Sequence, residues 1–166
     1  MAACKVQLIK LLSVFMVLWL LPGCAALSPY SELTKLNLRL TASDQLNPDL
    51  HGRPSPVVLR LIELKHPVAF ENADFFSLYE RAKESLSPDL VTSEELELRP
   101  GQSIELKLSI ESTSRYVGVL AAYRDLAQAR WRYVVPVTPM GLTSIELVFE
   151  RDGVRHRQDR LAQADQ

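Results

Sequence analysis

The feature that most restricts the fold of this chain is a repeated alternation of apolar and polar residues with a period of two. Leu36, Leu38 and Leu40 alternate with charged or polar residues, and the pattern returns from Ile104 to Ile110 and from Ile145 to Phe149. Because successive side chains of a β-strand point to opposite faces, this period predicts strands with one buried face. Each such face needs a second layer to cover it.

Other segments have the composition of strands without the strict alternation. Residues 57–64 are apolar on both faces, as in a central strand, and residues 116–123 form a dense apolar run in which Gly118 indicates a bulge or a close contact. Residues 131–137 are expected to form a strand that Pro136 restricts to an edge or a bulge.

One segment has helical periodicity. Its apolar residues recur with helical spacing at Phe75, Leu78, Tyr79, Ala82 and Leu86. Asn72 is positioned to cap the start of this helix, and Ser87-Pro88 ends it. Near the C-terminus, Asp152-Gly153 predicts a type I′ hairpin turn. With about eight strands and no β–helix–β rhythm, the expected fold is mainly β: a two-sheet antiparallel β-sandwich with one main added α-helix.

The N-terminal segment has the organisation of an export signal. Lys5 and Lys10 precede an uncharged, mostly apolar run from Leu11 to Leu21, and the run ends in Leu21-Pro22-Gly23-Cys24. These four residues resemble a bacterial lipobox, in which the cysteine is diacylated on sulfur and becomes the mature N-terminus. The alternative is an uncleaved transmembrane helix, but Pro22 and Gly23 interrupt the apolar stretch at about half the required length.

Cleavage before Cys24 leaves 143 of the 166 residues, the size of one ordinary domain. The expected division is a signal peptide at 1–23, a lipidated tether at 24–33, a β-sandwich domain at 34–158 and a frayed tail at 159–166. Ala25 follows the cysteine, which by the sorting rule of enteric lipoproteins implies the outer membrane.

Cys24 is the only cysteine expected in the mature chain, which excludes an internal disulfide. The formal net charge of −1 becomes more negative when Lys5 and Lys10 leave with the signal, and this argues against nucleic acid as a partner.

The sequence offers no pattern for catalysis. His51, His66 and His156 share no ligand spacing, and no nucleophile elbow, phosphate-binding loop or dinucleotide fingerprint occurs. We therefore expect a protein that is not an enzyme and has no metal ion, no cofactor and no small-molecule substrate. The only attached group expected is a covalent lipid on Cys24.

The segment from Ser43 to Pro56 is an unusually long predicted loop. Loops beyond about 12 residues in compact domains are usually functional or disordered. Pro48, Pro54 and Pro56 stiffen this one, which lowers the entropy lost when it docks on a partner. A docking loop and a variable surface loop remain equal alternatives on this evidence.

Several segments together resemble the type VI secretion lipoprotein family called TssJ, SciN or VasD. In chain order they are Cys24, Asn47-Pro48-Asp49 with the following 52–61, then 73–79, Leu98-Arg99-Pro100-Gly101, 116–125 and 129–132. The resemblance extends from the signal to about Pro136.

This resemblance implies a transthyretin-like β-sandwich and a role without catalysis. It also implies an outer-membrane lipoprotein that faces the periplasm and binds the periplasmic C-terminal domain of an IcmF-like inner-membrane protein. In the family, the loop between the first two strands carries much of the contact. In this chain the corresponding residues are Asp44, Gln45, Leu46, Asn47, Pro48, Asp49, Leu50, His51, Gly52 and Arg53. Removing 44–53 is accordingly expected to abolish partner binding and hardly change stability.

Two other functional classes are open to this fold. A transthyretin-like enzyme of the hydroxyisourate hydrolase type would end in Tyr-Arg-Gly-Ser, whereas residues 161–166 read Leu-Ala-Gln-Ala-Asp-Gln. A generic envelope lipoprotein that binds a small ligand or a cell-wall component would need a deep apolar pocket with a few polar groups.

Overall fold

The computed structural model describes residues 33–159. The predicted signal peptide, the lipidation site at Cys24, almost all of the predicted tether and residues 160–166 of the predicted tail lie outside the described residues, so these assignments stay predictions. The alternative of a transmembrane helix near the N-terminus lies outside them as well. Between residues 33 and 159, no helix has the length and apolar character needed to cross a membrane.

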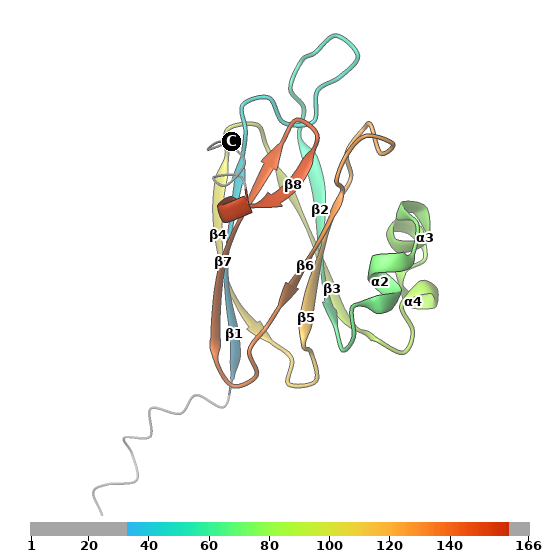
Figure 1. Cartoon of the computed structure of the whole chain (residues 1–166), viewed down its shortest axis with the longest axis vertical. Coiled ribbons are helices and arrows are strands. Elements are labelled where there is room, and N and C mark those ends of the chain that lie inside the picture. Colours follow the sequence, from blue (N-terminus) through green and yellow to red (C-terminus); the bar gives the residue numbers. More distant parts are fainter. Residues whose placement is uncertain (1–32, 160–166) are drawn as a thin grey trace, which may run out of the picture. The chain divides into compact units, whose positions relative to one another are not determined.

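Two four-stranded sheets make up the described part of the chain (Figure 1). The first sheet has the order β4-β1-β7-β8, formed by Ser103–Ile110, Thr34–Ala42, Leu142–Glu150 and Gly153–His156. The second has the order β3-β2-β5-β6, formed by Leu90–Leu98, Val57–Leu64, Tyr116–Ala121 and Arg132–Pro136. The predicted two-sheet sandwich is confirmed, with one difference in direction: β1 pairs with β7 in parallel, and the other strand pairs are antiparallel.

The period-two pattern predicted the buried faces correctly. Leu36, Leu38 and Leu40 of β1 are fully buried in the core between the sheets. On β4 the same alternation holds, but Leu106 is only half-buried because β4 is the edge strand beside β1. Pro136 lies on β6 at the edge of the second sheet, as its missing N–H requires.

The predicted single helix is divided into two short helices, α3 (Phe75–Glu80) and α4 (Ala82–Ser85), and a further short helix that was not predicted, α2 (Val68–Asn72), precedes them. The N-cap of α3 is Asp74, whose carboxylate accepts a 3.0 Å hydrogen bond from the N–H of Ser77, so the assignment of the cap to Asn72 is wrong. Arg81 has φ −130° and ψ 41°, outside the helical region, and this separates α3 from α4.

The helical segment nevertheless keeps the function predicted for it, which is to cover a sheet. Phe75, Leu78 and Leu86 pack in a second apolar cluster with Ile62 of β2 and Leu120 of β5. The helices therefore lie on the outer face of the second sheet (Figure 1).

The β7–β8 hairpin differs from the predicted type I′ turn. Its loop residues are Arg151 and Asp152, and neither has a positive φ; only Gly153 does, at 145°. A Cβ on Gly153 would lie 2.7 Å from backbone atoms of Arg130. The glycine is thus required by a close approach of two backbones, where Arg130 N donates to Asp152 O and Val154 N donates to Arg130 O.

Gly118 of β5 makes the close contact that its position in the strand predicted. A Cβ at this position would come within 2.9 Å of the ring of Phe70, which is fully buried under α2. Because Gly118 has no side chain, Phe70 of α2 packs directly against the backbone of β5.

We predict that Gly118→Ala lowers the free energy of unfolding by about 1–3 kcal/mol, because the new methyl group overpacks this contact. Chemical denaturation measures the change. Adding Phe70→Leu should recover part of the loss from Gly118→Ala, since the smaller side chain makes room. A loss that is simply additive in the double variant would show that the contact is not its cause.

Candidate functional site

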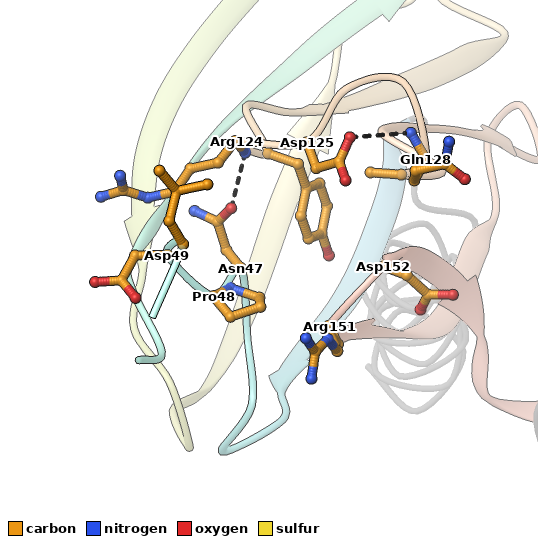
Figure 2. Close-up of a pocket in the computed structure, with 11 residues that line it drawn as sticks. Asn47, Pro48, Asp49, Arg124, Asp125, Gln128, Arg151 and Asp152 are labelled. Atoms are coloured by element: carbon orange, nitrogen blue, oxygen red, sulfur yellow. Dashed lines mark hydrogen bonds between the residues drawn. The ribbon is translucent and has the colours of Figure 1, made fainter. Parts of the chain in front are cut away.

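Three connections between strands meet at one end of the sandwich. They are the β1–β2 loop from Ser43 to Pro56, the β5–β6 connection at 122–131, and the β7–β8 turn at Arg151 and Asp152. Together they surround an open cleft of about 500 Å³ (Figure 2). Its lining residues are Asn47, Pro48, Asp49, Leu50, Tyr123, Arg124, Asp125, Gln128, Ala129, Arg151 and Asp152.

The base of the β1–β2 loop is built into the core. Leu46 is fully buried in the main apolar cluster, and Asn47 is 4% exposed. The Asn47 side chain accepts a 2.8 Å hydrogen bond from the N–H of Arg124 and donates one of 2.8 Å to the carbonyl of Pro56. Its φ of 45° lies in the left-handed region, which asparagine tolerates better than most residues. One side chain therefore joins both ends of the loop to the β5–β6 connection.

The start of the loop packs against the β3–β4 turn. The N–H of Gly101 donates to the carbonyl of Ser43, and a Cβ on Gly101 would lie 2.7 Å from a carboxylate oxygen of Asp44. Gln45 donates its N–H to the hydroxyl of Ser43 at 3.1 Å. Asp44 and Gln45 are therefore exposed to solvent, but they belong to a turn whose backbone is fixed by hydrogen bonds.

The tip of the loop closes on itself through Asp49. One carboxylate oxygen accepts hydrogen bonds from the N–H groups of His51 (2.8 Å) and Arg53 (2.9 Å), and the other lies 2.8 Å from Arg53 Nε. The hydrogen bond from the backbone of Arg53 is the main reason that the pKa of Asp49 is lowered. Gly52 completes the turn with φ 78°. The tip, residues 49–53, is thus a ring with a defined shape.

Leu50 is one of the residues that this ring encloses between Asp49 and Arg53. Its side chain is fully exposed, with a relative accessibility of 103%. Because the ring closes beneath it through Asp49 and Arg53, this leucine is presented to solvent from an ordered support.

The ten predicted loop residues thus lie in different surroundings. Asp44 and Gln45 are exposed, and Pro48 and Asp49 are half-buried. Leu46 and Asn47 are structural, whereas Leu50, His51, Gly52 and Arg53 are exposed at the tip. Removing 44–53 would take a leucine out of the core and two hydrogen bonds from the loop base. The expectation that this deletion hardly changes stability is therefore wrong, and an informative change must stay within the tip.

The sequence did not identify the cleft residues from the other two connections. Tyr123 is 4% exposed, its hydroxyl donates to the carbonyl of Glu150 at 3.1 Å, and burial raises its pKa. Arg124 and Asp125 follow it. All three lie in the 116–125 segment that carried the family resemblance, which was the only signal for them.

The cleft mixes charges of both signs. Arg124 and Arg151 line the cleft together with Asp49, Asp125 and Asp152 (Figure 2), and Asp152 is 2.9 Å from Arg155. Most of the lining residues are polar or charged, and the cleft is open, whereas a small-ligand site is typically a deep apolar pocket. In the part of the chain that the structure covers, no group of three or more His, Cys, Asp or Glu residues is placed to hold a metal ion.

We predict that Asn47→Ala lowers the free energy of unfolding by about 1–3 kcal/mol, because it leaves two partly buried backbone groups without their hydrogen-bond partner. Alanine at this position also strains the left-handed backbone. Asn47→Gly separates this strain from the loss of the hydrogen bonds, since glycine adopts the left-handed φ at no cost and lacks only the hydrogen bonds. Gln45→Ala, in the exposed part of the same loop, is the control and should change stability by less than about 0.5 kcal/mol. Thermal and chemical denaturation measure all three, and wild-type stability in both Asn47 variants would refute the role of this side chain.

The chain is similar to a known protein family and to solved structures. Residues 34–152 match the family model described as "Type VI secretion lipoprotein, VasD, EvfM, TssJ". The crystal structure of the type VI secretion lipoprotein TssJ1 from Pseudomonas aeruginosa aligns with 35% identity over 75% of this chain and 95% of that chain, with a TM-score of 0.73.

Two further structures extend the comparison. Lip from Serratia marcescens, described as a membrane-bound component of the type VI secretion system, has 28% identity over 74% of this chain and 96% of that chain, with a TM-score of 0.69. A chain in a structure titled "Type VI membrane complex" has 24% identity over 75% of this chain and 98% of that chain, with a TM-score of 0.66, and shows the shared fold. Among curated proteins, no sequence matches this chain significantly.

Proposed function

Because this chain belongs to the type VI secretion lipoprotein family, we propose that it is the outer-membrane adaptor of a type VI secretion membrane complex. Acyl chains on Cys24 hold it in the outer membrane, with the sandwich facing the periplasm. The tip of the β1–β2 loop docks on the periplasmic C-terminal domain of the IcmF-like inner-membrane component.

The observation that carries this proposal is the position of β1. The chain enters the sandwich at Thr34, the first residue of β1, and leaves this strand at Ala42, directly before the loop. A strand of this length spans about 30 Å. Figure 1 shows the start of β1 and the β1–β2 loop at opposite ends of the sandwich. The chain entry at Thr34 and the proposed docking loop after Ala42 are therefore separated by the full height of the domain.

The chemistry of the anchor suits a durable attachment. One myristoyl-sized chain gives only marginal membrane binding, whereas two or more chains hold a protein stably. A fully acylated Cys24 would meet this requirement without a membrane-spanning segment.

The closed ring at the loop tip suits docking. Asp49 already fixes the backbone from Asp49 to Arg53, so little conformational entropy remains to be lost when a partner binds. Leu50 offers an exposed apolar side chain that a pocket on the partner can bury. The alternative of a generic lipoprotein that binds a small ligand receives less support, because the cleft beside the loop is open and most of its lining residues are polar or charged.

We predict that Cys24→Ala abolishes incorporation of radiolabelled palmitate in cells and leaves the precursor unlipidated. The thiol is the proposed acylation site, so its loss removes the anchor. Cys4→Ala is the matched control and should be labelled like the wild type, since Cys4 lies within the expected signal. Continued palmitate incorporation in Cys24→Ala would exclude this cysteine as the lipidation site.

We predict that Leu50→Ala weakens binding of the unlipidated domain to the purified periplasmic domain of the IcmF-like protein by about tenfold or more, as truncation of a central contact does. The melting temperature should not change, because Leu50 makes no buried contact.

Val68→Ala provides the control for the Leu50 experiment. Val68 is apolar and 62% exposed, but it lies on α2, outside the loop cleft. Titration calorimetry of both variants compares the two surfaces. Equal affinities for Leu50→Ala and the wild type would remove the tip from the interface, and a selective loss in Val68→Ala would move the interface to the helices.

A further inference from the structure

A second group of exposed apolar side chains lies at the end of the sandwich where the chain enters. It consists of Leu33, Met140 and Leu142, which are 56%, 63% and 60% exposed. Backbone contacts hold the three close together: the N–H of Met140 donates to Thr34 Oγ1 at 3.0 Å, and Leu142 is the partner of Lys35 in the β1–β7 register. We call these three residues the base patch.

We propose that the base patch rests in the lipid head-group region of the membrane that carries the acyl anchor. Met140 and Leu142 would insert their side chains there and set the orientation of the domain. This inference rests on the proposed lipidation of Cys24 and goes beyond it, because an acyl anchor alone leaves the sandwich free to tilt.

The length of the tether favours the lipid surface as the occupant of the patch. Leu33 lies nine positions after Cys24, a distance of about 30 Å at full extension. To turn the loop end toward the membrane, the tether would have to run back along the whole of β1, which has a similar length. Only a tether at nearly full extension would bring the loop end to the leaflet, so the base is favoured as the end that faces it.

The turn that carries Met140 holds the side chain outward. Met140 has φ 53°, in the left-handed region that costs a non-glycine residue free energy. The turn is held by hydrogen bonds from Gly141 N to Thr138 O, from Thr138 N to Thr143 Oγ1, and from Lys35 N to Gly141 O. A large apolar side chain is thus presented to solvent by a well-fastened turn, with no benefit to the core.

The charges beside the base patch are compatible with a lipid interface. Lys35 is exposed next to the patch, and Arg115 is held at the same end by the hydrogen bond from Val137 N to its carbonyl. Long cationic side chains can keep their heads among phosphates while their stems cover apolar surface. Glu111 is the exposed acidic residue of the adjacent turn and faces the same end.

Site-directed fluorescence on the lipidated protein tests this inference. The whole sequence contains only Cys4 and Cys24, so once the signal is removed and Cys24 is acylated, a new cysteine is the only reactive thiol. Met140→Cys and Leu142→Cys are labelled with a polarity-sensitive fluorophore, and the protein is reconstituted in phosphatidylethanolamine–phosphatidylglycerol vesicles. Leu50→Cys is the matched control, an exposed leucine at the opposite end of the domain. Thermal unfolding shows that each variant is folded.

We expect emission from positions 140 and 142 to shift to shorter wavelength on reconstitution and to be quenched by brominated lipid, while position 50 keeps its aqueous spectrum. Aqueous spectra at 140 and 142 in protein whose acylation is verified by mass spectrometry would overturn the inference and leave the proposed function intact. A shift at all three positions would also overturn it, because the domain would then lie on its side. Protein without acyl chains would instead overturn the proposed anchor and, with it, this inference.

Discussion

The structure depends on the burial of β1 at the centre of one sheet. Leu36, Leu38 and Leu40 are inaccessible to solvent, while β4 and β7 satisfy the hydrogen bonds of the strand on both sides. Because both edges of β1 are paired and its inner face is packed, its two ends cannot move relative to each other. The base, where the chain enters, and the loop end are therefore held at a constant separation. For the proposed adaptor, this rigidity keeps the chain entry and the docking surface apart.

The base and the tip of the β1–β2 loop are stabilised by different contacts. Its base belongs to the core through Leu46 and is fastened to a neighbouring connection by Asn47. Its tip is closed only by local hydrogen bonds around Asp49 and extends into solvent. A tip with few contacts to the rest of the fold can change its surface without affecting stability. The base must keep its residues, since each one fills a buried position or pairs a buried polar group.

The sequence predicted both sheets and the burial of individual strand residues because a period of two depends only on the alternation of side chains along each strand. It failed where an outcome depends on contacts between distant segments. The apolar stripe from Phe75 to Leu86 has good helical spacing, yet Arg81 leaves the helical region and divides it. The hairpin before Gly153 differs from the predicted turn type, and the glycine is required instead by the close approach of the Arg130 backbone. The parallel pairing of β1 with β7 joins strands about 100 residues apart, and no local pattern encodes such a pairing.

The candidate site shows the same division. The sequence by itself determined that a long, proline-stiffened loop follows the first strand, because turn-forming residues and the absence of apolar periodicity are local properties. It also determined which strand faces are buried. Only the tertiary structure decided that Leu46 and Asn47 belong to the core, that Tyr123 and Arg151 line the same cleft as the loop, and that Met140 lies beside the chain entry. These relations arise when packing two sheets brings separate connections to the same end of the sandwich, and the free energy that holds them there comes from residues far away in the chain.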